Sequence, residues 1–506
     1  MATPSENLAA SLEVLKTLQH RDVVAIRTSQ ISRTHRERLL KNGFIREVMK
    51  GWYIATRPEE TQGESTAWYT SFWAFCADYL RERFGDEWCL SPEQSLTLFT
   101  GDWTVPRQVQ VRSPKGGNKP VPLPHETSII DLRLALPSAD EIEVNNGLRT
   151  YSLSAGLIAA SPTHFTMQPI VMRAALAAIT DASEVLGKLL EGGHSTIAGR
   201  LAGGFRNIGR TSIADNVVET MRAAGYTVNE TDPFKGLPHV ALSERETSPY
   251  VNRVSMVWQR MRQDVLGNFP APPKVLPDKA AYLQHVADVY ATDAYNSLSI
   301  EGYRVTPELI ERVRSGDWNP DTTKADRDQR DALAARGYWQ AFQRVKKSVG
   351  KVLDQTNAGK VAKDDHGAWY RELFGPSVTA GILKPADLAG YRNGPVYIRR
   401  SQHVPPNREA VRELMPAFLD LLQNEPEPAV RVVLGHFIFV YIHPYYDGNG
   451  RMGRFLMNVM LASGGYPWTV VPVTSRDEYM DVLEKASAKG DIIPFAQFLG
   501  KLLGTH

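Results

Sequence analysis

The stretch His443-Pro-Tyr-Tyr-Asp-Gly-Asn-Gly-Arg-Met-Gly-Arg454 brings together a histidine, a carboxylate, an amide, two arginines and three glycines within twelve residues. Apolar runs lead into it over 430–442 and out of it over 455–462. Pro444 cannot continue a helix through its own position, and Gly448 permits the backbone angles of a sharp turn. The pattern therefore predicts helix, tight loop, helix, with the free backbone N–H groups of the second helix forming a site for an anion.

The side chains of this stretch suit the handling of nucleotide phosphates. His443 is a candidate general base, since a neutral imidazole can accept a proton near pH 7. Asp447 can hold Mg²⁺, which takes one or two carboxylates together with phosphate oxygens. Arg451 and Arg454 lie three positions apart, so they share one face of a helix and can clamp successive phosphates. The candidates for close approach to a phosphate are Gly448, Asn449 and Gly450, of which Asn449 can also donate through its amide.

The same residues resemble the Fic family signature, HPFx[D/E]GNGRxxR, at every defined position except Tyr445, where the family usually has phenylalanine. The resemblance implies transfer of a nucleotide monophosphate, usually AMP from ATP, to a protein hydroxyl that His443 would deprotonate. Asp447 would hold Mg²⁺ (or Mn²⁺) at the phosphates. Transfer of UMP or phosphocholine, and removal of AMP, stay open as alternatives. The implied phosphate-binding set is Gly448, Asn449, Gly450, Arg451 and Arg454.

A second motif, Ser297-Leu-Ser-Ile-Glu-Gly302, lies earlier in the chain. Ser297 and Glu301 are four positions apart and face the same way on a helix, and Gly302 follows as a helix stop. Taken alone, Glu301 reads as a surface carboxylate. The motif resembles the inhibitory motif of the Fic family, [S/T]xxxE[G/N], which implies that Glu301 pairs with Arg454 and obstructs the γ-phosphate position in cis.

A third stretch, 391–406, contains an alternating segment that predicts a strand in a small hairpin. It resembles the flap of the Fic family, whose exposed strand edge adds a target peptide as another strand. The alternative is an ordinary hairpin. The predicted target-docking residues are Val396, Tyr397, Ile398 and Arg399.

The N-terminal residues predict a winged helix-turn-helix. A helix is expected over Arg33–Asn42, stopped by Gly43, and a hairpin over Phe44–Ile54. From Arg27 to Arg57 there are eight Arg or Lys residues and two Glu, a local net charge of +6. The pattern resembles the N-terminal region of AbiEi-type antitoxins, which implies duplex DNA as a partner, whereas a protein-interaction module with a basic face is the alternative. The candidate DNA-binding residues are Arg33, Arg36 and Arg38.

Composition places the whole chain among globular proteins. It has 506 residues, 42% hydrophobic and 23% charged, with a net charge of +2. Two cysteines, Cys76 and Cys89, make no disulfide framework, and neither a signal peptide nor a membrane span is evident, so a cytoplasmic location is expected.

The predicted fold class is multidomain α+β, with a mixed α/β module after the winged helix and a mostly α-helical Fic fold that carries a β-hairpin flap. The predicted function is autoinhibited protein adenylyltransferase, with ATP, a protein hydroxyl (this chain included) and a second copy of the chain as candidate partners. The alternative is a DNA-binding regulator that uses the Fic fold as a nucleotide sensor. The predicted domains are 1–58 (winged helix), 59–228 (antitoxin-like module), 229–277 (Pro-rich linker and start of the Fic region) and 278–506 (Fic domain).

Overall fold

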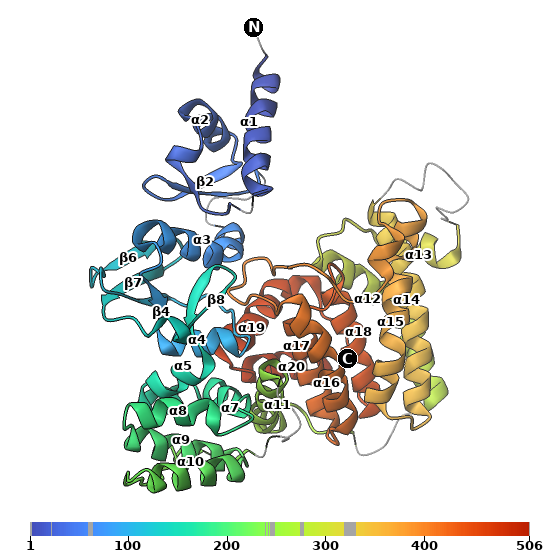
Figure 1. Cartoon of the computed structure of the whole chain (residues 1–506). Coiled ribbons are helices and arrows are strands. Elements are labelled where there is room, and N and C mark those ends of the chain that lie inside the picture. The colour runs from blue at the N-terminus through green and yellow to red at the C-terminus, as the bar shows by residue number, and fades with distance from the viewer. Residues whose placement is uncertain are drawn as a thin grey trace. The chain divides into compact units, whose positions relative to one another are not determined.

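The computed structural model forms two compact units, one made of Met1–Arg253 with Tyr397–Val404, the other of Val254–Val396 with Pro405–His506 (Figure 1). It describes residues 3–21, 23–58, 64–237, 239–240, 242, 248–273, 278–317 and 330–504. No helix within these ranges is long and apolar enough to cross a membrane.

The first unit begins with two helices and a small sheet. Ser32 caps α2 by accepting a hydrogen bond from the backbone N–H of His35 at 3.4 Å, and Gly43 ends the helical region with φ of 73°. Leu15 of α1 and Leu39 of α2 are buried in one apolar cluster with the sheet, whose order is β1-β3-β2. The predicted helix and hairpin are confirmed, while their assembly as a winged helix stays a prediction. The elements are α1 (Pro4–Gln19), β1 (Ile26–Arg27), η1 (Thr28–Gln30), α2 (Arg33–Lys41), β2 (Ile45–Met49) and β3 (Trp52–Ala55).

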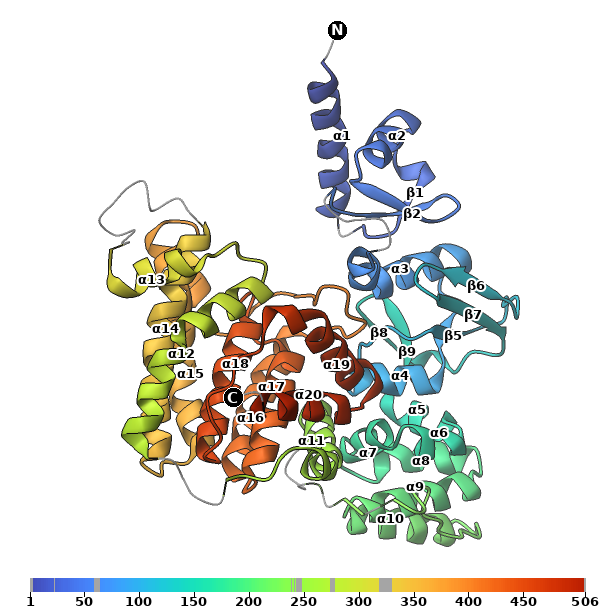
Figure 2. The ribbon, with the colours of Figure 1, turned by 180° about the vertical axis from the view of Figure 1, so that it is seen from behind.

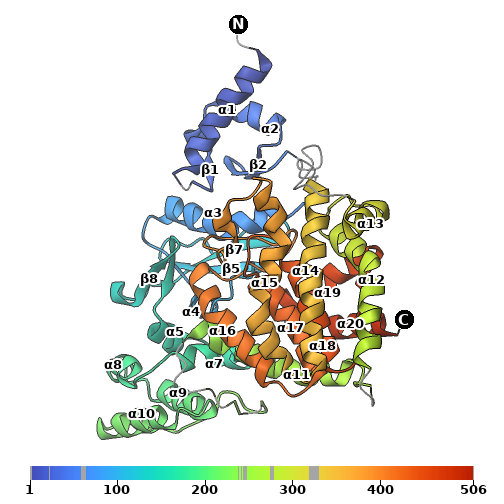
Figure 3. The ribbon, with the colours of Figure 1, turned by 90° about the vertical axis from the view of Figure 1, so that its right-hand side faces the viewer.

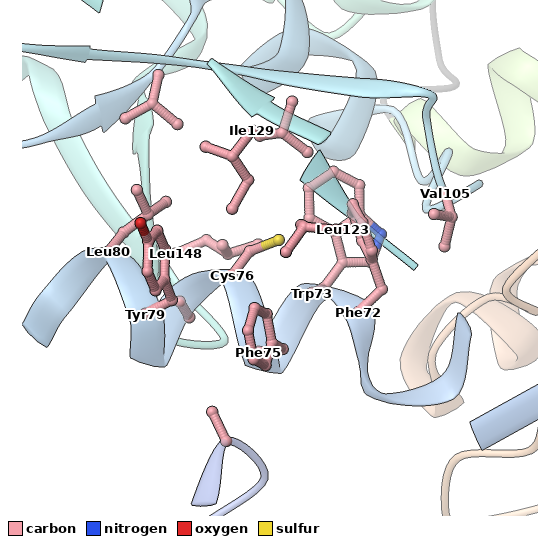
Figure 4. Close-up of a cluster of buried hydrophobic side chains, with 14 of the residues drawn as sticks. Phe72, Trp73, Phe75, Cys76, Tyr79, Leu80, Val105, Leu123, Ile129 and Leu148 are labelled. Atoms are coloured by element: carbon pink, nitrogen blue, oxygen red, sulfur yellow. The ribbon is translucent and has the colours of Figure 1, made fainter. Parts of the chain in front are cut away.

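A long aromatic helix, α3, then packs on a four-stranded sheet of order β4-β5-β7-β6, in which β5 and β7 are parallel. Trp73, Cys76 and Leu80 of α3 lie in one buried cluster with Leu123 and Ile129 of the sheet (Figure 4). The elements are α3 (Thr66–Phe84), β4 (Cys89–Leu90), α4 (Pro92–Phe99), β5 (Gln108–Ser113), β6 (Pro120–Leu123), β7 (Thr127–Arg133), η2 (Ala139–Glu141), β8 (Ile142–Asn145) and β9 (Leu148–Tyr151).

Short helices complete this part of the first unit, and α9 and α10 lie side by side (Figure 2). Two glycines of α9 allow the following chain to pass against the helix. A Cβ on Gly199 or Gly203 would stand 2.1 Å from the carbonyl oxygen of Asn229 or Thr231, respectively. The helices are α5 (Leu153–Ala159), α6 (Pro162–Met167), α7 (Pro169–Ala177), α8 (Ser183–Glu191), α9 (Ser195–Asn207) and α10 (Thr211–Ala223).

The second unit is helical. Its central helix, α17, is apolar on all sides and almost wholly buried, as expected for a core helix, and α14 and α15 run side by side (Figure 3). The helices are α11 (Pro249–Asn268, which crosses from the first unit), α12 (Lys279–Ile300), α13 (Pro307–Ser315), α14 (Arg330–Leu353), α15 (Ala358–Thr379), η3 (Pro385–Leu388), α16 (Arg408–Asn424), α17 (Pro428–Ile442), α18 (Asn449–Ser463), η4 (Val473–Ser475), α19 (Arg476–Lys489) and α20 (Ile493–Leu503).

The linker predicted over 229–277 and the strand predicted over Val396–Arg399 can both be compared with the structure. The predicted linker 229–277 contains a 20-residue helix, α11, which begins at Pro249, while 238, 241, 243–247 and 274–277 lie outside the described residues. The domain boundaries themselves stay predictions. The predicted strand over Val396–Arg399 is wrong, because that segment has no strand and turns at Arg399–Arg400, where Arg400 has φ of 61°.

Candidate functional site

The loop between α17 and α18 is held in an unusual conformation by its own side chains. His443, just after α17, is left-handed with φ of 53°, and Gly448, just before α18, has φ of 82°. Asn449 accepts from the backbone N–H of Tyr445 at 3.0 Å and donates to its carbonyl oxygen at 2.8 Å. The Asn449 amide therefore closes the loop, and its role as a phosphate donor stays a prediction. Its backbone N–H, at the first position of α18, remains available as a candidate.

The hydrogen bonding and burial of His443 favour a neutral imidazole that can accept a proton. Its Nδ1 lies 3.1 Å from the carbonyl oxygen of Val440, which can only accept, so Nδ1 carries the proton and Nε2 has the free lone pair. Partial burial lowers the pKa of His443 to about 4. The ring is therefore neutral, and able to take a proton, across the physiological range.

Arg451 presents unused donors from a buried position. Its guanidinium lies between the rings of Tyr303 and Phe374, each 5.1 Å from the guanidinium carbon, and the residue is 1% exposed. Its Nη2 lies 3.2 Å from the Asp447 carboxylate, yet neither Nε nor Nη2 has a well-aligned hydrogen bond to any residue that the structure describes. Buried donors are normally satisfied, so this arrangement fits an anionic ligand.

Arg454 is instead engaged by the second motif. Its Nε donates to Ser297 Oγ at 2.9 Å, and its Nη2 donates to the Ser297 carbonyl oxygen at 3.0 Å and to Glu301 Oε1 at 2.7 Å. Burial acts to lower the pKa of Arg454, but the Glu301 carboxylate raises it, and the net shift is upward. These contacts bring the two sequence motifs together around one guanidinium.

The end of α12 explains why Glu301 lies here. Gly302 is left-handed with φ of 86°, its N–H donates to the Ser299 carbonyl, and the N–H of Tyr303 donates to the Leu298 carbonyl. This Schellman ending fixes Glu301 one residue beyond the helix. A Cβ on Gly450 would stand 2.3 Å from Glu301 Oε1, so the carboxylate already lies against the first turn of α18.

Asp447 is the candidate metal ligand. Its side chain is 56% exposed, and Oδ1 accepts from the N–H of Gly448 at 2.6 Å. The described residues contain no cluster of three or more metal-ligating side chains. A single exposed carboxylate fits Mg²⁺ or Mn²⁺ bound chiefly through the phosphate oxygens of a nucleotide.

Three residues of the site were missed by the sequence interpretation. Tyr303 and Phe374 enclose Arg451, and Arg392 contacts the backbone of the His443 loop. Tyr303 directly follows the second motif, which could have drawn attention to it, whereas Phe374 on α15 and Arg392 carry no local signal in the sequence.

The predicted DNA-binding arginines have different environments. Arg33 is exposed and pairs with Glu37 at 2.6 Å, and Arg36 lies 5.9 Å from the ring centre of Tyr53. Arg38 Nη1 donates to the Asn7 carbonyl oxygen at 2.8 Å and to Ser11 Oγ at 2.9 Å, both on α1. Arg38 therefore joins α2 to α1 and is not directed outward as a phosphate contact requires.

The predicted docking segment belongs in part to the first unit. Arg399 pairs with the buried carboxylate of Glu64 at 2.7 Å, and the N–H of Arg400 donates to Thr66 Oγ1 at 3.1 Å. The Gln402 carbonyl oxygen accepts from the N–H of Val105 at 2.9 Å. These backbone groups have loop and side-chain partners, which is the physical reason why the expected hairpin is not formed.

Helices α17 and α18 and the loop between them form a candidate phosphate site next to a histidine. Residues 363–461 match the family model described as the Fic/DOC family. This part of the chain is therefore similar to the Fic/DOC family.

The similarity to individual proteins is partial. "Protein adenylyltransferase Fic" of Nematostella vectensis is 30% identical over 251 residues, covering 47% of this chain and 52% of that protein. The protein of the same name from Drosophila willistoni is 37% identical over 225 residues, covering 44% of this chain and 40% of the relative. The chain thus spans about half the length of these relatives. The solved structure "Fic-1 (aa134 - 508) from C. elegans" has a TM-score of 0.37 and 19% identity, covering 63% of this chain and 89% of that one.

Proposed function

We propose that this protein transfers AMP from ATP to a protein hydroxyl, including hydroxyls of its own chain, and that Glu301 holds it in an inactive state. The observation that carries the proposal is the unequal state of two neighbouring arginines. Arg451 has two buried nitrogens, Nε and Nη2, without aligned partners among the described residues, while Nε and Nη2 of Arg454 are occupied by Ser297 and Glu301 and only its Nη1 is left over. An anionic substrate would satisfy the first arginine and compete with a carboxylate for the second.

In the proposed reaction, the hydroxyl oxygen of the target attacks the α-phosphorus, and its proton passes to His443 Nε2. The bond from the α-phosphorus to the oxygen that bridges to the β-phosphorus breaks, and pyrophosphate leaves. Arg451, Arg454 and the first N–H groups of α18 would hold and neutralise the phosphates. Bound Mg²⁺ or Mn²⁺ would offset phosphate charge, and Asp447 would hold it.

The inhibition follows from competition for one guanidinium. Glu301 Oε1, 2.7 Å from Arg454 Nη2, takes the place of an outer phosphate oxygen and adds negative charge at the first turn of α18. A hydrogen bond between charged groups contributes about 1.5–3 kcal/mol. Removal of the carboxylate should therefore raise productive ATP binding and transfer by about 10- to 100-fold.

The test uses the full chain with labelled ATP and Mg²⁺. Glu301→Ala should increase label incorporation, and the double variant Glu301→Ala with His443→Ala should abolish it. Glu311→Ala is the matched control, since Glu311 is a carboxylate that pairs with Arg314 on the surface of α13. Equal incorporation by wild type and Glu301→Ala would overturn the inhibitory role, and unchanged incorporation without His443 would overturn its role as base.

Mass spectrometry of the modified chain after incubation with mixed nucleotides decides which group is transferred. A mass gain of AMP supports the proposal, whereas a gain of UMP or phosphocholine, or a loss of AMP, would contradict it and identify the reaction that takes place instead. The DNA-binding regulator remains a prediction from the sequence, and the placement of Arg38 between α1 and α2 gives it no support.

A further inference from the structure

Arg392 holds three successive carbonyl groups at the end of α17. Its Nε donates to the His443 carbonyl oxygen at 2.7 Å, and its Nη2 lies 3.4 Å from the Ile442 carbonyl oxygen. Its backbone N–H donates to the Pro444 carbonyl oxygen at 2.9 Å. One residue therefore supports the backbone just before, at and just after the candidate base.

The other donors of Arg392 extend the same network along the chain. Nη1 donates to the Gly394 carbonyl oxygen at 3.0 Å, and Nη2 also donates to the Pro406 carbonyl oxygen. The residue is 1% exposed, and no carboxylate pairs with it among the described residues. Burying a cation without an anion is unfavourable, and burial lowers the pKa of Arg392 to about 10. A neutral donor could bond to the same carbonyl groups without the desolvation penalty of a buried guanidinium.

The backbone conformation of His443 requires support from surrounding contacts, and the hydrogen bonds of Arg392 provide it. A histidine with φ of 53° and ψ of 59° occupies a region that residues with a Cβ rarely adopt, and surrounding contacts must maintain it. The hydrogen bond from Nδ1 to the Val440 carbonyl fixes the ring, but the backbone that carries the ring is fixed by Arg392.

The charge of Arg392 acts on the same imidazole. After burial, which is the largest cause, the positive charge of Arg392 lowers the pKa of His443, while Glu301 and Asp447 act to raise it. These three are the charged groups with the main influence on the ring among the described residues. Arg392 thus opposes the two carboxylates and favours the neutral form that can accept a proton.

We propose that Arg392 is a positioning residue for His443: its guanidinium fixes the loop that directs Nε2 toward the target hydroxyl. The claim about catalysis rests on the proposed function, whereas the claim about the loop concerns the protein without any substrate.

Two variants separate the two effects. Arg392→Lys keeps the charge but loses the planar set of donors, and Arg392→Gln keeps amide donors but loses the charge. Arg412→Gln is the control, because Arg412 is exposed and donates to the neighbouring Asn393 side chain at 2.5 Å. Histidine-labelled full-length chain is titrated by NMR, with the His443 signal among 12 histidines assigned through His443→Gln.

In Arg392→Gln the titration midpoint of His443 should move upward but stay below the ordinary value near 6.5, because burial is retained, while in Arg392→Lys it should not move. In the Glu301→Ala background both variants should lower kcat by roughly 100-fold, the effect of a small misplacement of a catalytic group. Their affinity for ATP should stay within about twofold, since Arg392 points to carbonyl groups and not to the phosphate site.

An unchanged His443 titration in Arg392→Gln, together with kcat no lower than in Arg412→Gln, would overturn the proposal. If the Gln variant fails to fold by circular dichroism, the Lys variant decides: a large fall in kcat with an unmoved titration and normal ATP affinity supports positioning, and normal kcat refutes it. If Glu301→Ala with Arg392 intact transfers no AMP, the proposed function fails, and the titrations still decide the effect of Arg392 on His443.

Discussion

Helices α2 and α18 both carry closely spaced arginines, yet only α18 has the character of an anion site. On α2, Arg33 is exposed beside Glu37 and Arg38 is bonded to α1. On α18, Arg451 and Arg454 are 1% and 3% exposed, and Arg451 retains buried donors without aligned partners among the described residues. The difference teaches that charge density alone does not identify a ligand site. Buried donors without aligned partners, next to a helix N-terminus, are the stronger indication, because leaving such donors without a ligand is unfavourable.

The largest effect should come from Arg454. Arg454→Gln in the Glu301→Ala background should weaken ATP binding by roughly 100-fold, because a charged donor to phosphate contributes up to about 3 kcal/mol. Calorimetric titration with ATP and Mg²⁺ measures this, with Arg33→Gln on α2 as the control. Similar losses of ATP affinity in Arg454→Gln and Arg33→Gln would show that α18 is no better an anion site than α2.

The second prediction tests whether ATP affinity depends on the planar shape of the Arg451 side chain as well as on its charge. Arg451→Lys keeps the charge but cannot stack as a plane between Tyr303 and Phe374, so ATP affinity should fall by roughly 20-fold, the equivalent of about 2 kcal/mol for a desolvated cation over aromatic rings. Arg36→Lys, which changes the cation near Tyr53 on α2, should leave ATP affinity unaltered. Full affinity in Arg451→Lys would mean that charge suffices at this position.

The burial of His436 in α17 should make the stability of the fold depend on pH. His436 is fully buried, its Nε2 lies 2.7 Å from the Tyr479 hydroxyl, and burial lowers its pKa to about 4. The unfolded chain binds a proton near pH 6.5 and the folded chain does not, so stability is lost as pH falls from about 6.5 toward 4. At pH 5.5 the loss from this one histidine should be about 1.4 kcal/mol relative to neutral pH.

Urea unfolding at several pH values checks this loss, and His436→Gln should flatten the slope by about one proton. An unaltered slope in the variant would show that His436 is not the group responsible.

The smallest effects should come from α2. Arg38→Met should lower the free energy of unfolding by about 1 kcal/mol through loss of its hydrogen bonds to Asn7 and Ser11. Arg33→Met should have no measurable effect. Urea unfolding distinguishes the two, and a parallel titration with duplex DNA tests whether the protein is a DNA-binding regulator. Salt-dependent DNA binding that Arg33→Met weakens would show that α2 contacts phosphates after all.

Local rules predicted the elements of the site well. The apolar runs around 443–454 predict helix, loop and helix, and the spacing of Ser297 and Glu301 predicts that both face the same way, as their shared contact with Arg454 shows, although Glu301 lies one residue beyond α12. Contacts between residues far apart in the sequence could not be predicted from local patterns. Phe374 reaches Arg451 from α15, and Arg392 reaches the His443 loop across about fifty positions, so neither has a signal in its own neighbourhood.

Two features of the structure have the same physical origin. The Asn449 amide bonds to the N–H and carbonyl of Tyr445, and the spacing of the two residues does not by itself predict these bonds. Residues 396–399 alternate as a strand does, but a strand also needs a neighbour of matching register. Here the nearby backbone groups pair with Val105 and Thr66, which lie far earlier in the chain.

The pairing of Arg399 with Glu64 has a consequence for biosynthesis. The two residues are 335 positions apart, and a ribosome adds about 5–20 residues per second, so Glu64 waits on the order of tens of seconds for its partner. The first unit therefore has all of its residues only after 397–404 have been made, which follows the synthesis of the whole of 254–396. Until then Glu64 lacks its partner, and an incompletely packed unit is open to misassembly.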